Sequence, residues 1–268
     1  MQTSRRISRE TGRFVRVTPG SQSLERGIRI LRAFLGGTPS LSNSELVQRV
    51  QLPKATVSRL CRSLVDTGLL DFDVKEEAYR LAPSCLSLGR AFQFSRSELG
   101  TVNGLLETFA RENQINVGLS AHDHVHMVYV TTFRKGRGAQ TRTVAAGLRL
   151  PIETCSPGIA YLAHLGANER AAVYELLADE HGPAWPKVRG PLNAAIREAL
   201  RRGYSQASSL LGNAGVGTIV RGPQGSIYGL NASYLASAGL PPQLTVETLG
   251  EKLLALAEEV EGVWGTTR

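Results

Sequence analysis

One stretch of the chain concentrates polar and basic side chains on one side of an expected helix. An expected helix near residues 53–67 turns small, basic and hydroxyl-bearing residues to one side and Val57, Leu60, Cys61 and Leu64 to the other. Small residues let a helix enter the major groove, arginines bond guanine edges or phosphates, and hydroxyls reach either. A lysine near the helix N-terminus adds a phosphate contact that the helix dipole favours. The candidate DNA-contacting residues on this helix are Lys54, Ala55, Thr56, Ser58, Arg59 and Arg62.

The net charge of +8 is concentrated in the first third of the chain. Residues 1–98 hold 16 Lys and Arg against 9 Asp and Glu, whereas residues 99–268 hold 15 against 14. A basic module joined to a nearly neutral one is typical of a protein that binds a polyanion. Residues 1–21 are interpreted as a basic flexible arm, in which Arg5 and Arg6 are further candidates for DNA contact. Charge alone leaves open the alternative of a basic, disordered tail on any other kind of protein.

The other reactive side chains show weaker patterns. His122, His124 and His126 have the i, i+2, i+4 spacing of one strand face, but the first two lie at an expected turn, so no metal site is predicted. The three cysteines are odd in number and far apart, which argues against a disulfide framework and suits a reducing cytoplasm. No apolar run approaches the length of a membrane span. We therefore expect no catalytic site, no cofactor, no metal and no membrane association, and a cytoplasmic location.

Helical periodicity indicates which elements position the DNA-contacting helix. A first helix is expected to begin with Ser23 as its N-cap and to end at 36–37. Its buried face is expected to contain Leu24, Ile28, Leu31 and Leu35. Ser42 and Glu45 have the spacing of a capping box, which begins a short second helix. Pro53 suits the first position of the third helix, and Gly68 suits the position just past its end.

A short hairpin is expected directly after the third helix. Residues 69–73 and 78–82 read as strands around the charged turn 74–77. The order of elements is a short helix, a tight turn, a helix with a polar and basic outer face, and then a hairpin. This order predicts a winged helix-turn-helix over residues 22–83. The alternative is a small helical subdomain whose arginines are only solvated.

The same residues carry a resemblance to a known family. Segments 23–31, 52–60 and 64–70 resemble the DNA-binding domain of IclR-type transcriptional regulators. Segments 79–83 and 86–89 resemble that family's wing and the start of its linker helix. The resemblance implies that residues 84–113 form a linker helix, which joins the domains and helps to form a homodimer or homotetramer.

The remaining residues, 114–268, mix alternating and helical periodicity. Strands are expected at 115–120, 125–130, 139–146, 216–221 and 226–233. Helices are expected at about 156–165, 168–178 and 191–202, and from Thr245 onward. This order predicts an α+β fold with a central antiparallel sheet flanked by helices. The resemblance implies a GAF/profilin-like effector-binding domain.

The resemblance also implies where a small effector binds. Segments 147–152 and 154–160 resemble the strand, loop and helix that form one pocket wall, and segment 225–233 resembles a late strand that faces the ligand. A helix N-terminus suits a carboxylate. The chain departs from the family pattern at 157–160 and 203–209, where a lysine and acidic residues are usual. The candidate effector-binding residues are Cys155, Ser156, Ser208, Asn231 and Ser233.

Together these patterns predict a ligand-responsive transcriptional regulator of the IclR type. We expect it to bind a pseudo-palindromic operator in double-stranded DNA, to control a metabolic or catabolic operon, and to respond to a small organic acid. The alternative is an enzyme or a small-molecule sensor with a basic N-terminal appendage that does not bind DNA specifically.

Overall fold

The computed structural model describes residues 20–134, 146–208 and 212–266. The chain divides into two compact units, Met1–Phe92 and Gln93–Arg268, which are described separately below. The basic arm with Arg5 and Arg6, and nearly all of the strand expected at 139–146, lie outside the described residues.

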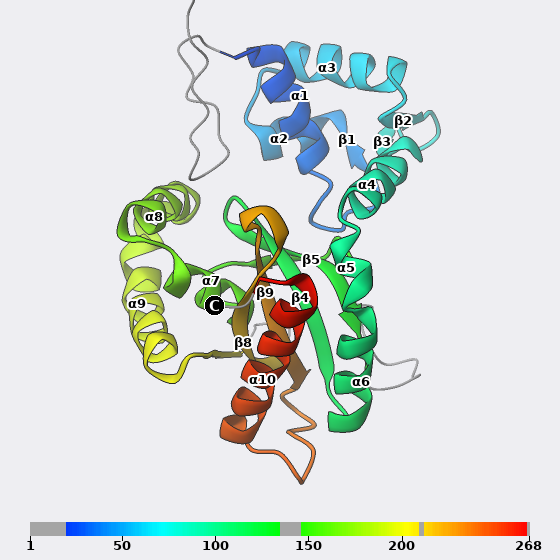
Figure 1. The fold of residues 1–268 in the computed structure, drawn as a ribbon. Helices are drawn as coiled ribbons and strands as arrows, with labels where there is room; N and C mark the ends of the chain where they lie inside the picture. Colours follow the sequence, from blue (N-terminus) through cyan, green and yellow to red (C-terminus); the bar gives the residue numbers. More distant parts are fainter. Residues whose placement is uncertain (1–19, 135–145, 209–211, 267–268) are drawn as a thin grey trace, which may run out of the picture. The chain divides into compact units, whose positions relative to one another are not determined.

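The described part of the first unit is a winged helix-turn-helix (Figure 1). Its elements are α1 (Gln22–Arg32), β1 (Leu41–Ser42), α2 (Asn43–Val50), α3 (Lys54–Asp66), β2 (Leu70–Asp73), β3 (Ala78–Leu81) and the first part of α4 (Ser84–Ser95). The three strands form an antiparallel sheet in the order β1-β3-β2. The predicted helices and wing are confirmed, but the two-residue strand β1 was not expected. It pairs Leu41 with Tyr79 of the wing.

Helix α1 differs from the expectation in its cap and in its buried face. The N-cap is Ser21, whose hydroxyl accepts a bond from the backbone N–H of Leu24, so the helix begins earlier than predicted. Ile30 and Phe34 are buried in the core of the unit. Leu24 is instead 66% exposed, and Ile28 and Leu35 are exposed as well. The predicted set and the pair Ile30 and Phe34 both have helical spacing. Packing against α2 and α3 buries Ile30 and Phe34 in place of the predicted set.

The ends of α2 and α3 follow from local sequence. The predicted capping box is present, because Glu45 N donates to Ser42 Oγ and Ser42 N donates to Glu45 Oε2 at 2.8 Å. Gln51 ends α2 in the left-handed region, with φ of 51°, which turns the chain tightly toward α3. Pro53 is the N-cap of α3, one position before its predicted place. Gly68 follows α3 with φ of +71°, as expected.

The wing turn is held by Asp73 at the end of β2. Its Oδ1 accepts bonds from the backbone N–H groups of Lys75 and Glu76 at 2.9 and 3.1 Å. Arg80 on β3 pairs with Oδ2 at 3.0 Å. The backbone bond from Glu76 contributes most to holding the pKa of Asp73 below its usual value.

Residues 84–113 form three helices where one linker helix was expected. They are α4, α5 (Glu98–Thr101) and α6 (Asn103–Asn113). Leu86 on α4 is 79% exposed, whereas Leu99 and Leu106 are buried in the second unit. The end of this segment therefore belongs to the body of the second unit.

The second unit is built on a six-stranded antiparallel sheet in the order β6-β5-β4-β9-β8-β7 (Figure 1). The strands are β4 (Asn116–Asp123), β5 (His126–Phe133), β6 (Arg149–Pro151), β7 (Ser205–Ser208), β8 (Asn213–Arg221) and β9 (Ile227–Leu235). The edge strand β7 was not expected. The β4–β5 turn is shorter than predicted, since His122 lies within β4 and only His124, with φ of 59°, lies at the turn.

Helices cover both faces of this sheet. Residues of α6 and α10 (Val246–Trp264) share one core cluster with the strands. The other core cluster is built from α7 (Ser156–His164), α8 (Ala167–His181) and α9 (Trp185–Arg202). The helix predicted from Thr245 onward is confirmed, and its apolar side is buried at Leu249, Leu253, Leu256 and Val260. No helix in the described ranges is long and apolar enough to span a bilayer.

Candidate functional site

The outer face of α3 presents the residues predicted to contact DNA. Lys54, Ala55, Arg59 and Arg62 are exposed, and Thr56 and Ser58 are half-buried. On the opposite side, Val57, Cys61 and Leu64 are buried in the core. Pro53 at the N-cap has no side-chain acceptor, so the N–H groups of the first turn remain available to a phosphate. The helix can therefore offer guanidinium, ammonium and backbone donors on one surface.

Ser58 also joins the two helices of the helix-turn-helix. Its Oγ accepts a bond from Asn43 Nδ2 at 2.9 Å, which connects the first turn of α2 to the middle of α3. Asn43 Oδ1 is buried and has no hydrogen-bond partner in the described chain. The sequence interpretation missed Asn43, because the capping box already accounted for this end of α2. No local signal connects residue 43 to residue 58.

In the second unit, the N-terminus of α7 lies directly on the sheet. A Cβ on Gly217 would lie 2.6 Å from the carbonyl carbon of Ser156, and a Cβ on Gly229 would lie 2.7 Å from Pro157 Cβ. Ser205 Oγ on β7 donates to the Ser156 carbonyl at 2.5 Å. Glycines permit this close approach because they have no Cβ. Strands β7, β8 and β9 thus determine where α7 begins.

Three buried polar side chains lie close together near this helix start. The Tyr129 hydroxyl on β5 hydrogen-bonds with the Asn231 side chain on β9 and lies near Cys155, the N-cap of α7. Burial raises the pKa of Tyr129, although the Asn231 bond opposes this shift, and burial raises the pKa of Cys155 to about 12. Both groups are therefore neutral at physiological pH. Asn231 is 3% exposed, and its Oδ1 has no hydrogen-bond partner among the described residues. This buried acceptor lacks the hydrogen-bond donor that such groups usually have.

Known proteins resemble the chain in both units. The model of the IclR helix-turn-helix domain matches residues 23–74, from α1 to the wing turn. The HTH-type transcriptional regulator TsaQ1/TsaQ2 of Comamonas testosteroni is 28% identical over 246 residues, which cover 89% of this chain and 87% of that protein. The structure of an IclR family transcriptional regulator from Brucella abortus is 26% identical and covers 91% of this chain and 92% of that chain, with a TM-score of 0.80.

These similarities, in the helix-turn-helix domain and along most of the chain, support an IclR-family transcriptional regulator. The transcriptional repressor IclR of Escherichia coli (strain K12) is 23% identical over 188 residues, which cover 69% of this chain and 68% of the repressor. An IclR homologue from Microbacterium hydrocarbonoxydans, solved with 4-hydroxybenzoate, shares the fold with a TM-score of 0.64 at 21% identity, over 92% of this chain and 100% of that chain. The relatives named here are transcriptional regulators and not enzymes. The fold class and the DNA-binding helix-turn-helix predicted from the sequence are thus confirmed.

The structure brings some of the predicted effector-binding residues together. Tyr129 interacts with the side chains of both Asn231 and Cys155. Ser233 is half-buried and shares the sheet face of Asn231, since side chains alternate along β9. Ser156 is buried, and its backbone carbonyl accepts the bond from the Ser205 hydroxyl.

Ser208 does not join this group. Ser205 on the same strand reaches α7, so Ser208, three residues later, faces the other side of the sheet, and it is exposed. The sequence interpretation missed Tyr129. The position of Tyr129 in the alternating pattern of β5 is the sequence signal that could have placed it.

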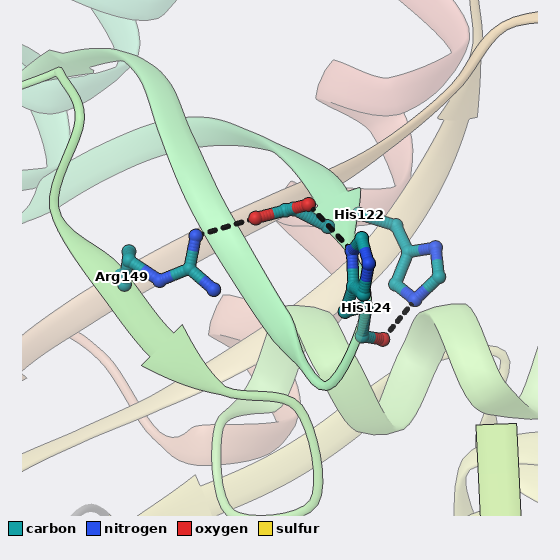
Figure 2. Close-up of polar contacts among 4 residues, drawn as sticks. His122, His124 and Arg149 are labelled. Carbon is teal, nitrogen blue, oxygen red and sulfur yellow. Dashed lines mark hydrogen bonds and ion pairs between the residues drawn. The ribbon is translucent and has the colours of Figure 1, made fainter. Parts of the chain in front are cut away.

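Two of the histidines set aside in the sequence, His122 and His124, belong to a polar cluster at the tip of the β4–β5 hairpin (Figure 2). Asp123 pairs with Arg149 of β6 at 2.5 Å and with His124 Nδ1 at 2.8 Å. His122 Nε2 hydrogen-bonds with the His124 carbonyl, and its ring stacks on Tyr161 of α7 at a centroid distance of 4.7 Å. No group of three or more metal-binding side chains is placed to hold a metal within the described ranges. The contacts connect β6 and α7 to the hairpin tip.

Proposed function

We propose that this IclR-family regulator binds a pseudo-palindromic operator as a homodimer or homotetramer, and that a small organic acid changes this binding. Residues 22–83 form the DNA-binding domain in this proposal, 84–113 the linker and dimerisation segment, and 114–268 the effector-binding domain. The protein acts in the cytoplasm and controls a metabolic or catabolic operon. The observation that supports DNA binding most strongly is the exposed basic and small-residue face of α3.

Each residue of this face has a proposed role on DNA. Arg59, in the second turn of α3, reads a base edge in the major groove, and Arg62, one turn later, bonds a base edge or a phosphate. Lys54 holds a phosphate beside the helix N-terminus. Ala55 and Thr56 allow close approach, and Ser58 keeps α3 in place through Asn43. The arm with Arg5 and Arg6 adds contacts to the phosphates or the minor groove.

Binding to the DNA that flanks the gene tests this assignment. We expect sequence-specific binding whose log K falls steeply with log salt concentration. Arg59→Ala should weaken binding to the cognate duplex by about 1–3 kcal/mol, whereas Lys54→Ala should weaken binding to all sequences and reduce the salt slope. Arg197→Ala is the matched control, because Arg197 is exposed on α9 of the second unit. An unchanged binding curve for Arg59→Ala would remove α3 from its assigned role.

We propose that the effector is an organic acid that also carries a hydroxyl group. The N-terminus of α7 supplies partial positive charge for a carboxylate, while the buried Oδ1 of Asn231 needs a hydrogen-bond donor, which a carboxylate lacks. Cys155, Ser156, Asn231 and Ser233 form the site in this proposal, together with Tyr129. A related fold is known with 4-hydroxybenzoate bound, and that ligand carries both groups.

Paired ligands test the effector class. Calorimetric titration would compare hydroxylated acids with their parent acids, beginning with 4-hydroxybenzoate against benzoate. We expect the hydroxylated member of at least one pair to bind roughly tenfold more tightly, since an unmet buried acceptor costs about 1–3 kcal/mol. Asn231→Leu should remove this preference, whereas Ser208→Ala, outside the site, should keep it. Equal affinity within every pair would refute the hydroxyl requirement.

A further inference from the structure

A side-chain hydrogen bond joins the two helices of the helix-turn-helix and involves a residue on the outer side of α3. Asn43 Nδ2, in the first turn of α2, donates to Ser58 Oγ at 2.9 Å. The Ser58 hydroxyl forms no other hydrogen bond within the part of the chain that the structure describes. A hydroxyl group has one proton and two lone pairs. The bond from Asn43 therefore occupies a lone pair and leaves the proton without an acceptor in the described protein.

Ser58 lies in the middle of the face that is proposed to enter the major groove. Ala55 lies one turn before it and Arg62 one turn after it, and both are exposed, whereas Ser58 is half-buried. The small side chain of Ala55 leaves room for DNA to come close to this part of the helix. The centre of a recognition helix faces the base edges, and the phosphates lie to either side. The short Ser58 side chain is therefore placed to meet a base edge.

A second hydroxyl on the same helix has the opposite arrangement. Ser63 Oγ donates its proton to the backbone carbonyl of Arg59 at 3.3 Å. Only lone pairs remain for a further partner, so Ser63 can accept a hydrogen bond but has no proton left to donate. Ser58 and Ser63 thus differ in the direction of the bond that each can form, although the residue type is the same.

The direction of the bond between α2 and α3 depends on the amide group of Asn43. Its nitrogen faces Ser58, while its Oδ1 is buried and has no hydrogen-bond partner in the described chain. A carboxylate at this position could only accept, so it would take the Ser58 proton and leave the lone pairs of the hydroxyl for DNA. Asn43→Asp therefore reverses the bond with almost no change in the shape of the side chain.

We propose that Ser58 is a specificity-determining residue that donates a hydrogen bond to an acceptor on a base edge, and that Asn43 is the positioning residue that gives the hydroxyl this direction. The acceptors in the major groove are guanine O6 and N7, adenine N7 and thymine O4, whereas the amino groups of adenine and cytosine are donors. The operator should therefore present an acceptor, and not an amino group, opposite Ser58. This inference rests on the proposed function, namely that α3 reads an operator in the major groove.

A base-pair scan of the bound duplex tests the proposal with the full-length protein. Each base pair of one half-site is replaced in turn by the other three, and the affinity is measured for every duplex. We expect the wild type to prefer an acceptor at the position opposite Ser58, and Ser58→Ala to reduce this one preference roughly two- to tenfold, the size of one hydrogen bond. Asn43→Asp should shift the same preference toward a base that offers an amino group. Ser63→Ala is the matched control and should leave every preference unchanged.

The outcomes are read beside the thermal midpoint of each variant. Loss of one preference in Ser58→Ala, together with its shift in Asn43→Asp, supports the proposal. An affinity loss in Ser58→Ala that is equal for all base pairs means a phosphate contact and overturns it, and so do unchanged preferences beside a lowered midpoint, which mean a purely structural bond. A wild-type preference in Asn43→Asp overturns the role of Asn43. A wild type that binds every duplex equally overturns the proposed function itself.

Discussion

Substitution of Gly217 by alanine tests whether the sheet determines the position of α7. An added Cβ would lie 2.6 Å from Ser156 C, 2.7 Å from Ser156 O and 2.8 Å from Pro157 N. All three atoms belong to the backbone, so no side-chain rotation can relieve the contact. Carbon atoms pack at about 3.5–4.0 Å, so the start of α7 must move by roughly 1 Å. Overpacking of this kind costs about 1–3 kcal/mol.

Thermal unfolding of full-length Gly217→Ala measures this cost. We expect the second unit to lose several degrees in its midpoint, at roughly 2–4 °C per kcal/mol. Because Cys155 and Tyr129 adjoin the displaced helix start, hydroxy-acid affinity should fall as well. Gly262→Ala is the matched control, since a Cβ there meets nothing within 4 Å and the position is inside α10, where alanine should stabilise by about 0.5–1 kcal/mol. Wild-type stability and ligand affinity in Gly217→Ala would refute the reasoning.

Three further predictions concern stability. Glu45→Ala removes half of the capping box of α2 and should lower the urea midpoint of the first unit, and an unchanged midpoint would show that the box contributes nothing. Burial, followed by Arg149, lowers the pKa of His126, so its neutral form is favoured in the folded protein. The contribution of neutral His126 to the stability of the second unit should therefore be fully present above the unfolded pKa of about 6.5, and it should decrease as the pH falls through that value. His126→Gln should flatten this pH dependence of the stability between about pH 7 and 5.5. Glu261 is buried and accepts a bond from Arg221 N at 2.8 Å, with Arg221 Nη1 3.6 Å away, so Glu261→Ala should cost about 1–3 kcal/mol and Glu261→Gln, which keeps an acceptor, distinctly less. Equal losses in those two variants would argue against this account.

Features that depend on neighbouring residues were predictable from the sequence. The capping box of Ser42 and Glu45 requires only a spacing of three, and the stripe of α10 only a helical period. Alternation also located most of β8 and β9. The charge division between the two parts of the chain pointed to a polyanion-binding first part, although charge alone left a basic tail as the alternative.

Features that depend on packing partners were not predictable. Helix α1 carries two overlapping apolar sets, and only contact with α2 and α3 buries Ile30 and Phe34 in place of Leu24. Strand β1 is two residues long, too short for any alternation. At the candidate effector site, Tyr129 and Asn231 lie 102 positions apart in the sequence and meet only because β4 pairs with both of their strands. The tertiary structure alone brings such residues together.

The pairing of β4 with β9 has a consequence for synthesis of the protein. Residues 116–121 form the centre of the sheet together with residues 228–233, so about a hundred residues must be made before this pair can close. The first unit needs no such distant partner, because its longest strand pairing joins residues 41 and 79. On the ribosome, the helix-turn-helix can therefore fold while β4 still has one unpaired edge. For that interval the nascent chain presents a DNA-binding unit before its second unit is complete.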